Sequence, residues 1–355
     1  MKSMIFLFYD FEIGGAQNAL VNICNSFSTR KIKCYAICLN NNGPLLDNIN
    51  KDVDVICLNQ KRIMYSVFKL IILVREIKPT ALISTLYGLG KLLVILKLFF
   101  GQKVITCYRE ATNPNKDLKR NSIWNKLIYY FNDVIICNSQ CVINEIININ
   151  HISINKIFLL RNSISSAQVL NSKNNNDFKR FLFVGRIDRV KRIELQLMAL
   201  SKLDPTKYFF NIYGKIVDKK YYEELLKLVV KLNIKNNVNF IFGVIDKSII
   251  YKDSDFLFMT SKYEGFPTVL LEAITYNVYP ISFNIKCGPS EIIKSNLVGK
   301  LISEPKKNKD DLLFKTINKC WNFKVDNLEA QKILSQFDID NNINLFLDFL
   351  NDKAS

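Results

Sequence analysis

The stretch from Ser261 to Ala273 reads Ser-Lys-Tyr-Glu-Gly-Phe-Pro-Thr-Val-Leu-Leu-Glu-Ala and combines a turn, a helix start and two carboxylates. Pro267 suits the first turn of a helix, where its missing N–H leaves no hydrogen bond unmade. The backbone N–H groups at such a helix start favour a phosphate group. The candidate phosphate-binding residues are Gly265, Phe266, Pro267 and Thr268.

Two glutamates of the same stretch, Glu264 and Glu272, stand eight residues apart. Glu264 precedes the helix start and Glu272 lies about one turn inside it, so both carboxylates could face one cleft at different depths. One would then lie near a sugar and the other near a ribose. The alternative makes Glu264 an acid that complements the helix dipole and Glu272 an acid on the helix surface.

A second candidate site is the segment from Leu182 to Arg192, Leu-Phe-Val-Gly-Arg-Ile-Asp-Arg-Val-Lys-Arg. Gly185 allows the chain to turn after an apolar run, and Arg186 and Lys191 follow it. Both cations would point beyond the carboxyl end of a sheet, where open α/β folds bind ligands. Such a pair suits a diphosphate, although a solvated basic loop remains the alternative.

A third candidate is the turn Tyr-Asp-Phe-Glu-Ile-Gly-Gly-Ala-Gln, from Tyr9 to Gln17. Gly14 and Gly15 would let the backbone approach a ligand closely, and the helix start after them favours negative charge. The spacing is not Gly-x-Gly-x-x-Gly, so it does not support a dinucleotide site. An ordinary tight turn between a strand and a helix is the alternative.

The elements that must position these residues form a regular alternation of short apolar runs and amphipathic segments. This pattern predicts the α/β class, with parallel sheets covered by helices on both faces. The expected strands are Met4–Tyr9, Ile32–Leu39, Val53–Leu58, Ala81–Ser84, Val104–Cys107, Val134–Cys137, Ile157–Leu160, Phe181–Val184, Tyr208–Tyr213, Val238–Phe242, Phe256–Met259, Tyr279–Phe283 and Val298–Ile302.

A polar segment rich in Ser and Asn, residues 162–177, interrupts the alternation and predicts an exposed connection. We therefore expect two doubly wound domains, residues 1–163 and 164–335, each with its own parallel sheet. Residues 336–355 are expected to form a C-terminal helix that packs back toward the first domain.

Together these motifs resemble the retaining glycosyltransferases of family 4, which have the GT-B architecture of two Rossmann-like domains facing each other across a cleft. The resemblance covers nearly the whole chain, and Glu264 with Glu272 matches the paired-glutamate signature of the family. It extends to three further segments: Asn237-Val-Asn-Phe-Ile-Phe-Gly243, Cys287-Gly-Pro-Ser-Glu-Ile-Ile293 and Gly299.

The resemblance implies that Arg186 and Lys191 bind the diphosphate of a nucleotide sugar, with a UDP-sugar favoured. It further implies that Glu272 binds the ribose and Glu264 the transferred sugar. The first domain would bind the acceptor, the second domain the donor, and configuration would be retained. The Gly-Pro-Ser-Glu-Ile-Ile segment is similar to members that build bacterial surface polysaccharides, such as O-antigen, capsule or lipopolysaccharide.

The chain departs from the family pattern in its first half. Gln17 stands where many members have an acid, and the histidine that many carry near the reacting centre is absent. The matching segment is Cys-Tyr-Arg-Glu-Ala, which makes Arg109 and Glu110 active-site candidates; a surface ion pair is the alternative. The single histidine of the chain, His151, lies near the connection between the domains and is expected to be structural.

Metal ions and cofactors have little support in the sequence. The nearest Asp-x-Asp patterns, Asp52 with Asp54 and Asp338 with Asp340, lie outside the expected cleft or lack other support. We therefore expect a metal-independent reaction with no cofactor beyond the donor. The nine cysteines lack the spacing of zinc ligands, and their irregular set predicts reduced thiols and a cytoplasmic protein.

The net charge of +17 is large enough to suggest a polyanionic partner, and three classes could account for it: nucleic acid, anionic lipid or a phosphorylated substrate. Residues 1–165 hold 20 Lys and Arg against 10 Asp and Glu, and include two apolar basic segments, 62–78 and 91–103. We expect a lipid-linked acceptor and attachment to the inner face of the cell membrane, without a membrane-spanning segment. The alternatives are a nucleic-acid-binding protein, for which no recognition motif is found, and a sugar-nucleotide epimerase or phosphorylase of the same fold.

Overall fold

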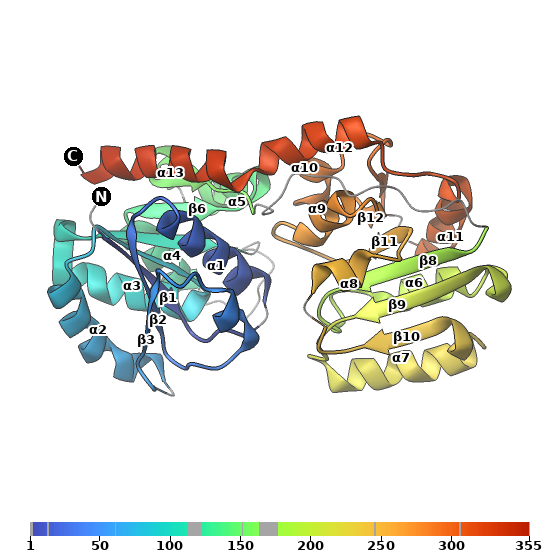
Figure 1. Ribbon diagram of the computed structural model, residues 1–355, viewed down its shortest axis with the longest axis horizontal. Helices are drawn as coiled ribbons and strands as arrows, with labels where there is room; N and C mark the ends of the chain where they lie inside the picture. The colour runs from blue at the N-terminus through green and yellow to red at the C-terminus, as the bar shows by residue number, and fades with distance from the viewer. Residues whose placement is uncertain are drawn as a thin grey trace. The chain divides into compact units, whose positions relative to one another are not determined.

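The computed structural model describes residues 3–12, 14–60, 62–111, 122–150, 152–162, 177–244, 246–304 and 307–354. The chain forms two compact units, one of residues 1–165 with 337–355 and one of residues 166–336 (Figure 1). His151 and most of the polar connection lie outside the described residues. Each unit is built on a single parallel sheet.

The sheet of the first unit has seven parallel strands in the order β3-β2-β1-β4-β5-β6-β7. The strands are β1 (Ser3–Phe8), β2 (Lys33–Cys38), β3 (Asp54–Cys57), β4 (Ala81–Thr85), β5 (Ile105–Glu110), β6 (Val134–Cys137) and β7 (Ile157–Leu159). The helices are α1 (Gly15–Ser28), α2 (Ile63–Ile77), α3 (Tyr87–Phe100), α4 (Ser122–Phe131), α5 (Gln140–Asn150) and α13 (Ile339–Ala354).

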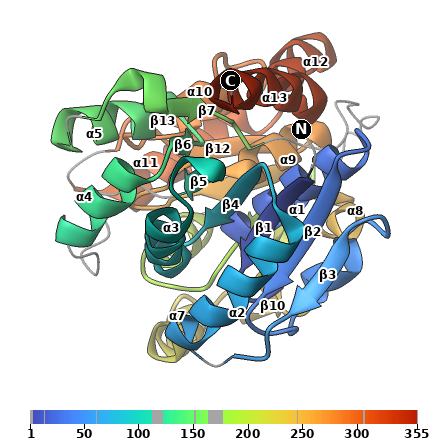
Figure 2. The same ribbon diagram turned by 90° about the vertical axis from the view of Figure 1, so that its left-hand side faces the viewer.

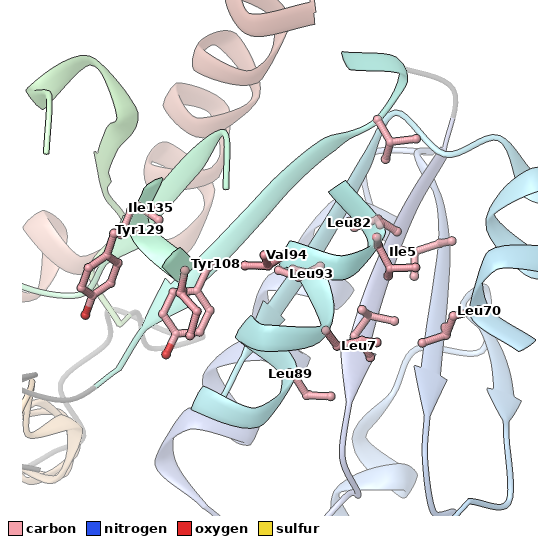
Figure 3. Close-up of a cluster of buried hydrophobic side chains, with 14 of the residues drawn as sticks. Ile5, Leu7, Leu70, Leu82, Leu89, Leu93, Val94, Tyr108, Tyr129 and Ile135 are labelled. Carbon is pink, nitrogen blue, oxygen red and sulfur yellow. The ribbon is translucent and has the colours of Figure 1, made fainter. Parts of the chain in front are cut away.

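Both faces of this sheet are buried because its strands are apolar on both sides. In β1, Ile5 and Leu7 belong to a core cluster with residues of helices α2 to α5, whereas the alternate residues Met4 and Phe6 belong to a cluster with residues of α1 and α13. Figure 2 shows these helices around the sheet. Figure 3 shows part of the first of these clusters, with side chains from strands and helices in contact.

The C-terminal helix α13 is a covering layer of the first unit. Phe346 is fully buried, and its ring lies 6.1 Å from that of Phe27 and 5.0 Å from that of Phe158. At the rim, Arg30 pairs with Asp340 at 2.8 Å. The sequence returns to the first unit after the second unit is complete, so its two segments fold as one body.

The sheet of the second unit has six parallel strands in the order β10-β9-β8-β11-β12-β13. The strands are β8 (Lys179–Val184), β9 (Tyr208–Tyr213), β10 (Val238–Ile241), β11 (Phe256–Met259), β12 (Tyr279–Phe283) and β13 (Lys300–Ile302). The helices are α6 (Ile193–Leu200), α7 (Lys219–Lys231), α8 (Lys247–Tyr251), α9 (Thr268–Thr275), α10 (Pro289–Ile292), α11 (Lys309–Cys320) and α12 (Asn327–Leu334).

The strand order of each sheet reverses once, between β1 and β4 in the first unit and between β8 and β11 in the second. Ligands of open α/β folds bind at the carboxyl ends of the strands beside such a reversal. In the second unit, the ring of Phe181 in β8 stacks on that of Phe258 in β11 at 5.0 Å, which fixes these two strands side by side. Their carboxyl ends continue into the two motifs around Arg186 and Glu264.

The α/β class expected from the sequence is confirmed, and each expected strand overlaps an observed one. The largest difference is at β5, which continues through Glu110 instead of ending at Cys107. None of the helices in the described part of the chain is both long enough and apolar enough to cross a membrane.

Candidate functional site

The loop after β8 turns at Gly185, whose φ of +155° is unfavourable for any residue with a side chain. Arg186 follows, with a mostly exposed side chain that lies 3.3 Å from the Asp188 carboxylate. Lys191, at the far end of the loop, is instead largely buried. The two predicted diphosphate ligands therefore differ, because one is free to reorient and the other is fixed.

Lys191 and Glu264 form an ion pair, with 2.5 Å between Nζ and Oε1. Their side chains are only 16% and 18% exposed. The pair joins the loop after β8 to the loop after β11, and the Lys262 N–H donates to the Val190 carbonyl at 2.8 Å beside it. An ammonium group next to a carboxylate offers a ligand a cation for phosphate and an acceptor for hydroxyl groups.

Arg192, at the end of the loop after β8, connects this loop to the loop after β11. It donates to the carbonyl of Thr260 at 2.6 Å and to that of Ser261 at 2.9 Å. Its guanidinium also pairs with Glu304, and the hydrogen bonds from Arg192 and Lys309 lower the pKa of Glu304 to about 2. This role was not predicted from the sequence, because an arginine among other basic residues gives no indication that its side chain is buried.

Glu272 lies inside α9 and has two partners from α8. Tyr251 donates to Oε2 at 2.8 Å, and the Nζ atom of Lys247 lies 2.7 Å from Oε1. The Glu272 side chain is 11% exposed, so the alternative that it is a helix-surface acid is wrong. Burial, followed by the Glu272 carboxylate, raises the pKa of Tyr251, which keeps its hydroxyl group protonated as a donor.

The loop between Glu264 and Glu272 leads directly into a helix start. Thr268 is the first residue of α9, and Pro267 is the residue before it rather than part of the first turn. Phe266 is buried beside it. Gly288 packs so closely that a Cβ atom there would lie 2.3 Å from Cδ of Pro267. The Cys-Gly-Pro-Ser motif thus supports the turn that Gly265 begins.

The two glycines of the first unit lie at the start of α1. Gly14 is the N-cap residue in an extended conformation, and a Cβ there would meet the Gln17 side chain at 2.4 Å. Within the described part of the chain, a Cβ on Gly15 would meet no atom within 4 Å. Protein packing therefore does not demand glycine at position 15, and the open space remains consistent with a close ligand.

Arg109 and Glu110 do not form a surface ion pair, because both side chains are buried within β5. As neighbours on a strand they point to opposite faces of the sheet. Glu110 accepts from Tyr129 at 2.8 Å on the face shown in Figure 3. On the other face Arg109 donates to Asn162, and its Nε and Nη1 atoms have no hydrogen-bond partner among the residues that the structure describes.

Burial lowers the pKa of Arg109 to about 10, which still leaves the guanidinium charged at neutral pH. A buried cation with two unused donors is costly unless an anion or water binds it. This cost is the structural reason to keep Arg109 as a candidate ligand of an anionic substrate group. Glu110 contacts the tyrosines of the core, so the two residues cannot share one role.

The aspartate pairs have structural partners. Asp54 lies 2.7 Å from the Nζ atom of Lys33. Asp338 accepts from the backbone N–H groups of Asp340 and Asn341 at the start of α13. Among the described residues, no group of three or more His, Cys, Asp or Glu side chains could hold a metal ion.

Comparison with known proteins agrees with this geometry. The family described as "Glycosyl transferases group 1" matches residues 167–320. The chain is 28% identical over 210 residues to the "Uncharacterized 41.2 kDa protein in cps region" of Klebsiella pneumoniae, which covers 52% of this chain and 54% of the relative. The chain thus spans only about half the length of that relative.

A second relative is the N-acetylgalactosamine-N,N'-diacetylbacillosaminyl-diphospho-undecaprenol 4-alpha-N-acetylgalactosaminyltransferase of Campylobacter jejuni, 27% identical over 228 residues, or 61% of each chain. Among solved structures, Anabaena Alr3699/HepE in complex with UDP and glucose superposes with a TM-score of 0.81. That structure is 18% identical and covers 99% of this chain and 100% of its own.

Two Rossmann-like parallel-sheet domains of this kind define the GT-B fold, and the chain has that fold. The match of residues 167–320 to the group 1 glycosyl transferases confirms the resemblance read from the motifs of the second unit.

The Arg192–Glu304 pair predicts an acid-sensitive second unit. The pKa of Glu304 is lowered from 4.5 to about 2, so the pair stabilises the fold above pH 4.5 and is lost as the pH falls toward 2. We expect Glu304→Gln to lower the free energy of unfolding at pH 7 by about 1 to 2 kcal/mol. It should also flatten the pH dependence of stability in that window.

Urea unfolding of the second unit at a series of pH values measures both effects. Glu329→Gln is the control, because Glu329 is paired only loosely, with 3.8 Å to Lys332. An equal free energy of unfolding for wild type and Glu304→Gln at every pH would show that the Arg192–Glu304 pair does not stabilise the loops.

Proposed function

We propose that the chain transfers a sugar from a nucleoside diphosphate sugar, with a UDP-sugar favoured, to a lipid-linked or saccharide acceptor in bacterial surface polysaccharide synthesis. The observation that carries the proposal is the buried Lys191–Glu264 pair at the carboxyl ends of β8 and β11. The family of residues 167–320 supports it. So do the bound UDP of the Anabaena structure and the diphospho-undecaprenol in the name of the Campylobacter relative.

In this proposal the residues of the second unit stabilise the charge that collects on the departing diphosphate. Arg186 and Lys191 provide cations, and the backbone N–H groups of Gly265, Phe266 and Thr268 provide fixed donors at the start of α9. Glu264 accepts from the hydroxyl groups of the transferred sugar, and Glu272 accepts from those of the ribose. The transfer retains configuration, and the first unit binds the acceptor.

Glu264→Ala tests the sugar contact. We expect turnover to fall by about 10²- to 10³-fold, the usual effect of losing one group that stabilises the transition state. Nucleotide binding should largely survive, because Lys191 and the start of α9 remain. Turnover is measured as nucleoside diphosphate release, and binding by calorimetry. Glu223→Ala, an exposed glutamate on α7, is the control; unchanged turnover in Glu264→Ala would refute the assignment.

Transfer should continue in the presence of EDTA. Arg186, Lys191 and the N–H groups of the α9 start supply the positive potential that a metal ion would otherwise give to the diphosphate. Turnover is compared in EDTA and in Mn²⁺ at equal ionic strength. Loss of transfer in EDTA that Mn²⁺ restores would contradict metal independence.

We further propose that the first unit attaches to an anionic membrane surface through α2, where a lipid-linked acceptor would be found. One side of α2 packs on the sheet through Val67, Leu70 and Val74. The other side exposes four large apolar side chains, between 55% and 78% exposed: Met64, Tyr65, Phe68 and Ile72. We call these residues the α2 face.

Charge around the α2 face favours an anionic lipid surface. Arg62, Lys69 and Arg75 are exposed beside the apolar residues. An apolar strip bordered by cations is the pattern of helices that lie in the headgroup layer, where each cation near the surface adds about 1 kcal/mol. The excess of basic residues in residues 1–165 acts in the same direction.

The double variant Phe68→Ser/Ile72→Ser tests this attachment. Burial of these side chains in lipid would be lost, so we expect the bound fraction on vesicles of phosphatidylcholine with phosphatidylglycerol to fall about tenfold or more. Cosedimentation at low salt measures it. Leu226→Ser/Val230→Ser is a matched control, because α7 exposes these apolar residues at the same spacing.

Equal binding of both double variants, or no binding of the wild type, would contradict membrane attachment through the α2 face. A wild-type dimer that only Phe68→Ser/Ile72→Ser dissociates would instead assign this surface to a second copy of the chain.

A further inference from the structure

The carboxylate of Glu272 is held at both oxygen atoms by one short helix. Lys247 and Tyr251 are the first and last residues of α8, four positions apart, so their side chains lie on the same side of the helix. Lys247 contacts Oε1 at 2.7 Å, and Tyr251 donates to Oε2 at 2.8 Å. The start of α8 is fixed by Asp246, which accepts from the Ser248 N–H at 2.8 Å.

The contacts of Tyr251 and Lys247 with Glu272 differ in their exposure to solvent. Tyr251 is completely buried, so its hydrogen bond to Glu272 belongs to the core. The side chain of Lys247 is 42% exposed and reaches the carboxylate from the solvent side. Lys247 therefore lies on the side from which a ligand must approach Glu272.

A carboxylate in the donor site creates an electrostatic problem. A nucleoside diphosphate is an anion, so an unpaired Glu272 carboxylate would repel it. The carboxylate must also be held in one orientation to accept from two neighbouring hydroxyl groups. A neighbouring ammonium group removes both difficulties, because it neutralises the charge and holds the carboxylate in place.

We propose that Lys247 is a positioning residue that sets the preference of the donor site for ribonucleotides. It neutralises and orients the Glu272 carboxylate, so that the carboxylate can accept from the hydroxyl groups of a ribose and the site rejects a 2′-deoxyribose. The inference rests on the proposed function, because it assumes that Glu272 contacts the ribose. Neither the spacing of the glutamates nor the Gly-Phe-Pro turn indicates Lys247.

The experiment compares Kd values for a ribonucleoside diphosphate and its 2′-deoxy counterpart by calorimetry. The probe is whichever of UDP, GDP and ADP binds the wild type most tightly. We expect the wild type to prefer the ribonucleotide about tenfold or more, as for a hydrogen bond to a charged group. Lys247→Ala should lose most of this preference through weaker ribonucleotide binding, and Lys247→Arg should keep it.

Lys252→Ala is the matched control, because Lys252 is an exposed lysine at the other end of α8. A general loss of positive potential would weaken both nucleotides equally in Lys247→Ala and Lys252→Ala, and would overturn the inference. A wild-type preference that survives in Lys247→Ala would overturn it while leaving the proposed function intact. A wild type that binds no nucleoside diphosphate would overturn the proposed function, and the inference with it.

Discussion

The site of the second unit depends on the buried guanidinium group of Arg192. It bonds two consecutive carbonyl groups at the end of β11 and pairs with Glu304, which follows β13. The next residue toward the N-terminus is Lys191, so the same anchor fixes the lysine against Glu264. A buried cation of this kind must be fully paired, since removal of one partner leaves an uncompensated charge. The hydrogen bonds and the ion pair of the Arg192 guanidinium group therefore fix the geometry of the two loops.

This anchoring explains how a flexible lysine can take part in a precise site. Lysine side chains lose considerable conformational entropy when they are fixed. The loop around Lys191 is already ordered by its neighbours, among them the hydroxyl group of Thr260, which donates to the Lys191 carbonyl at 2.8 Å. Groups fixed before the ligand arrives can stabilise developing charge without reorganising, which is the basis of electrostatic catalysis.

Much of the fold could be predicted because parallel strands buried on both faces read as continuous apolar runs. The resemblance assigned Lys191 and Glu264 to one donor site, but their direct contact was found only in the structure. Arg192 and Lys247 could not be recognised, because burial and pairing of a basic residue depend on partners far along the chain. The opposite orientations of Arg109 and Glu110 were not predicted, because the strand was expected to end at Cys107. The observed β5 continues through both polar residues to Glu110.

In the proposed function, the Lys191–Glu264 pair lies in a site for a nucleoside diphosphate. The most direct measurement is calorimetric titration of the wild type and Lys191→Ala with UDP, GDP and ADP. We expect one diphosphate to bind the wild type and Lys191→Ala to weaken this binding about tenfold or more, as for a lost charged hydrogen bond. Binding of equal strength in the two proteins, or no binding of any diphosphate to the wild type, would contradict the proposal.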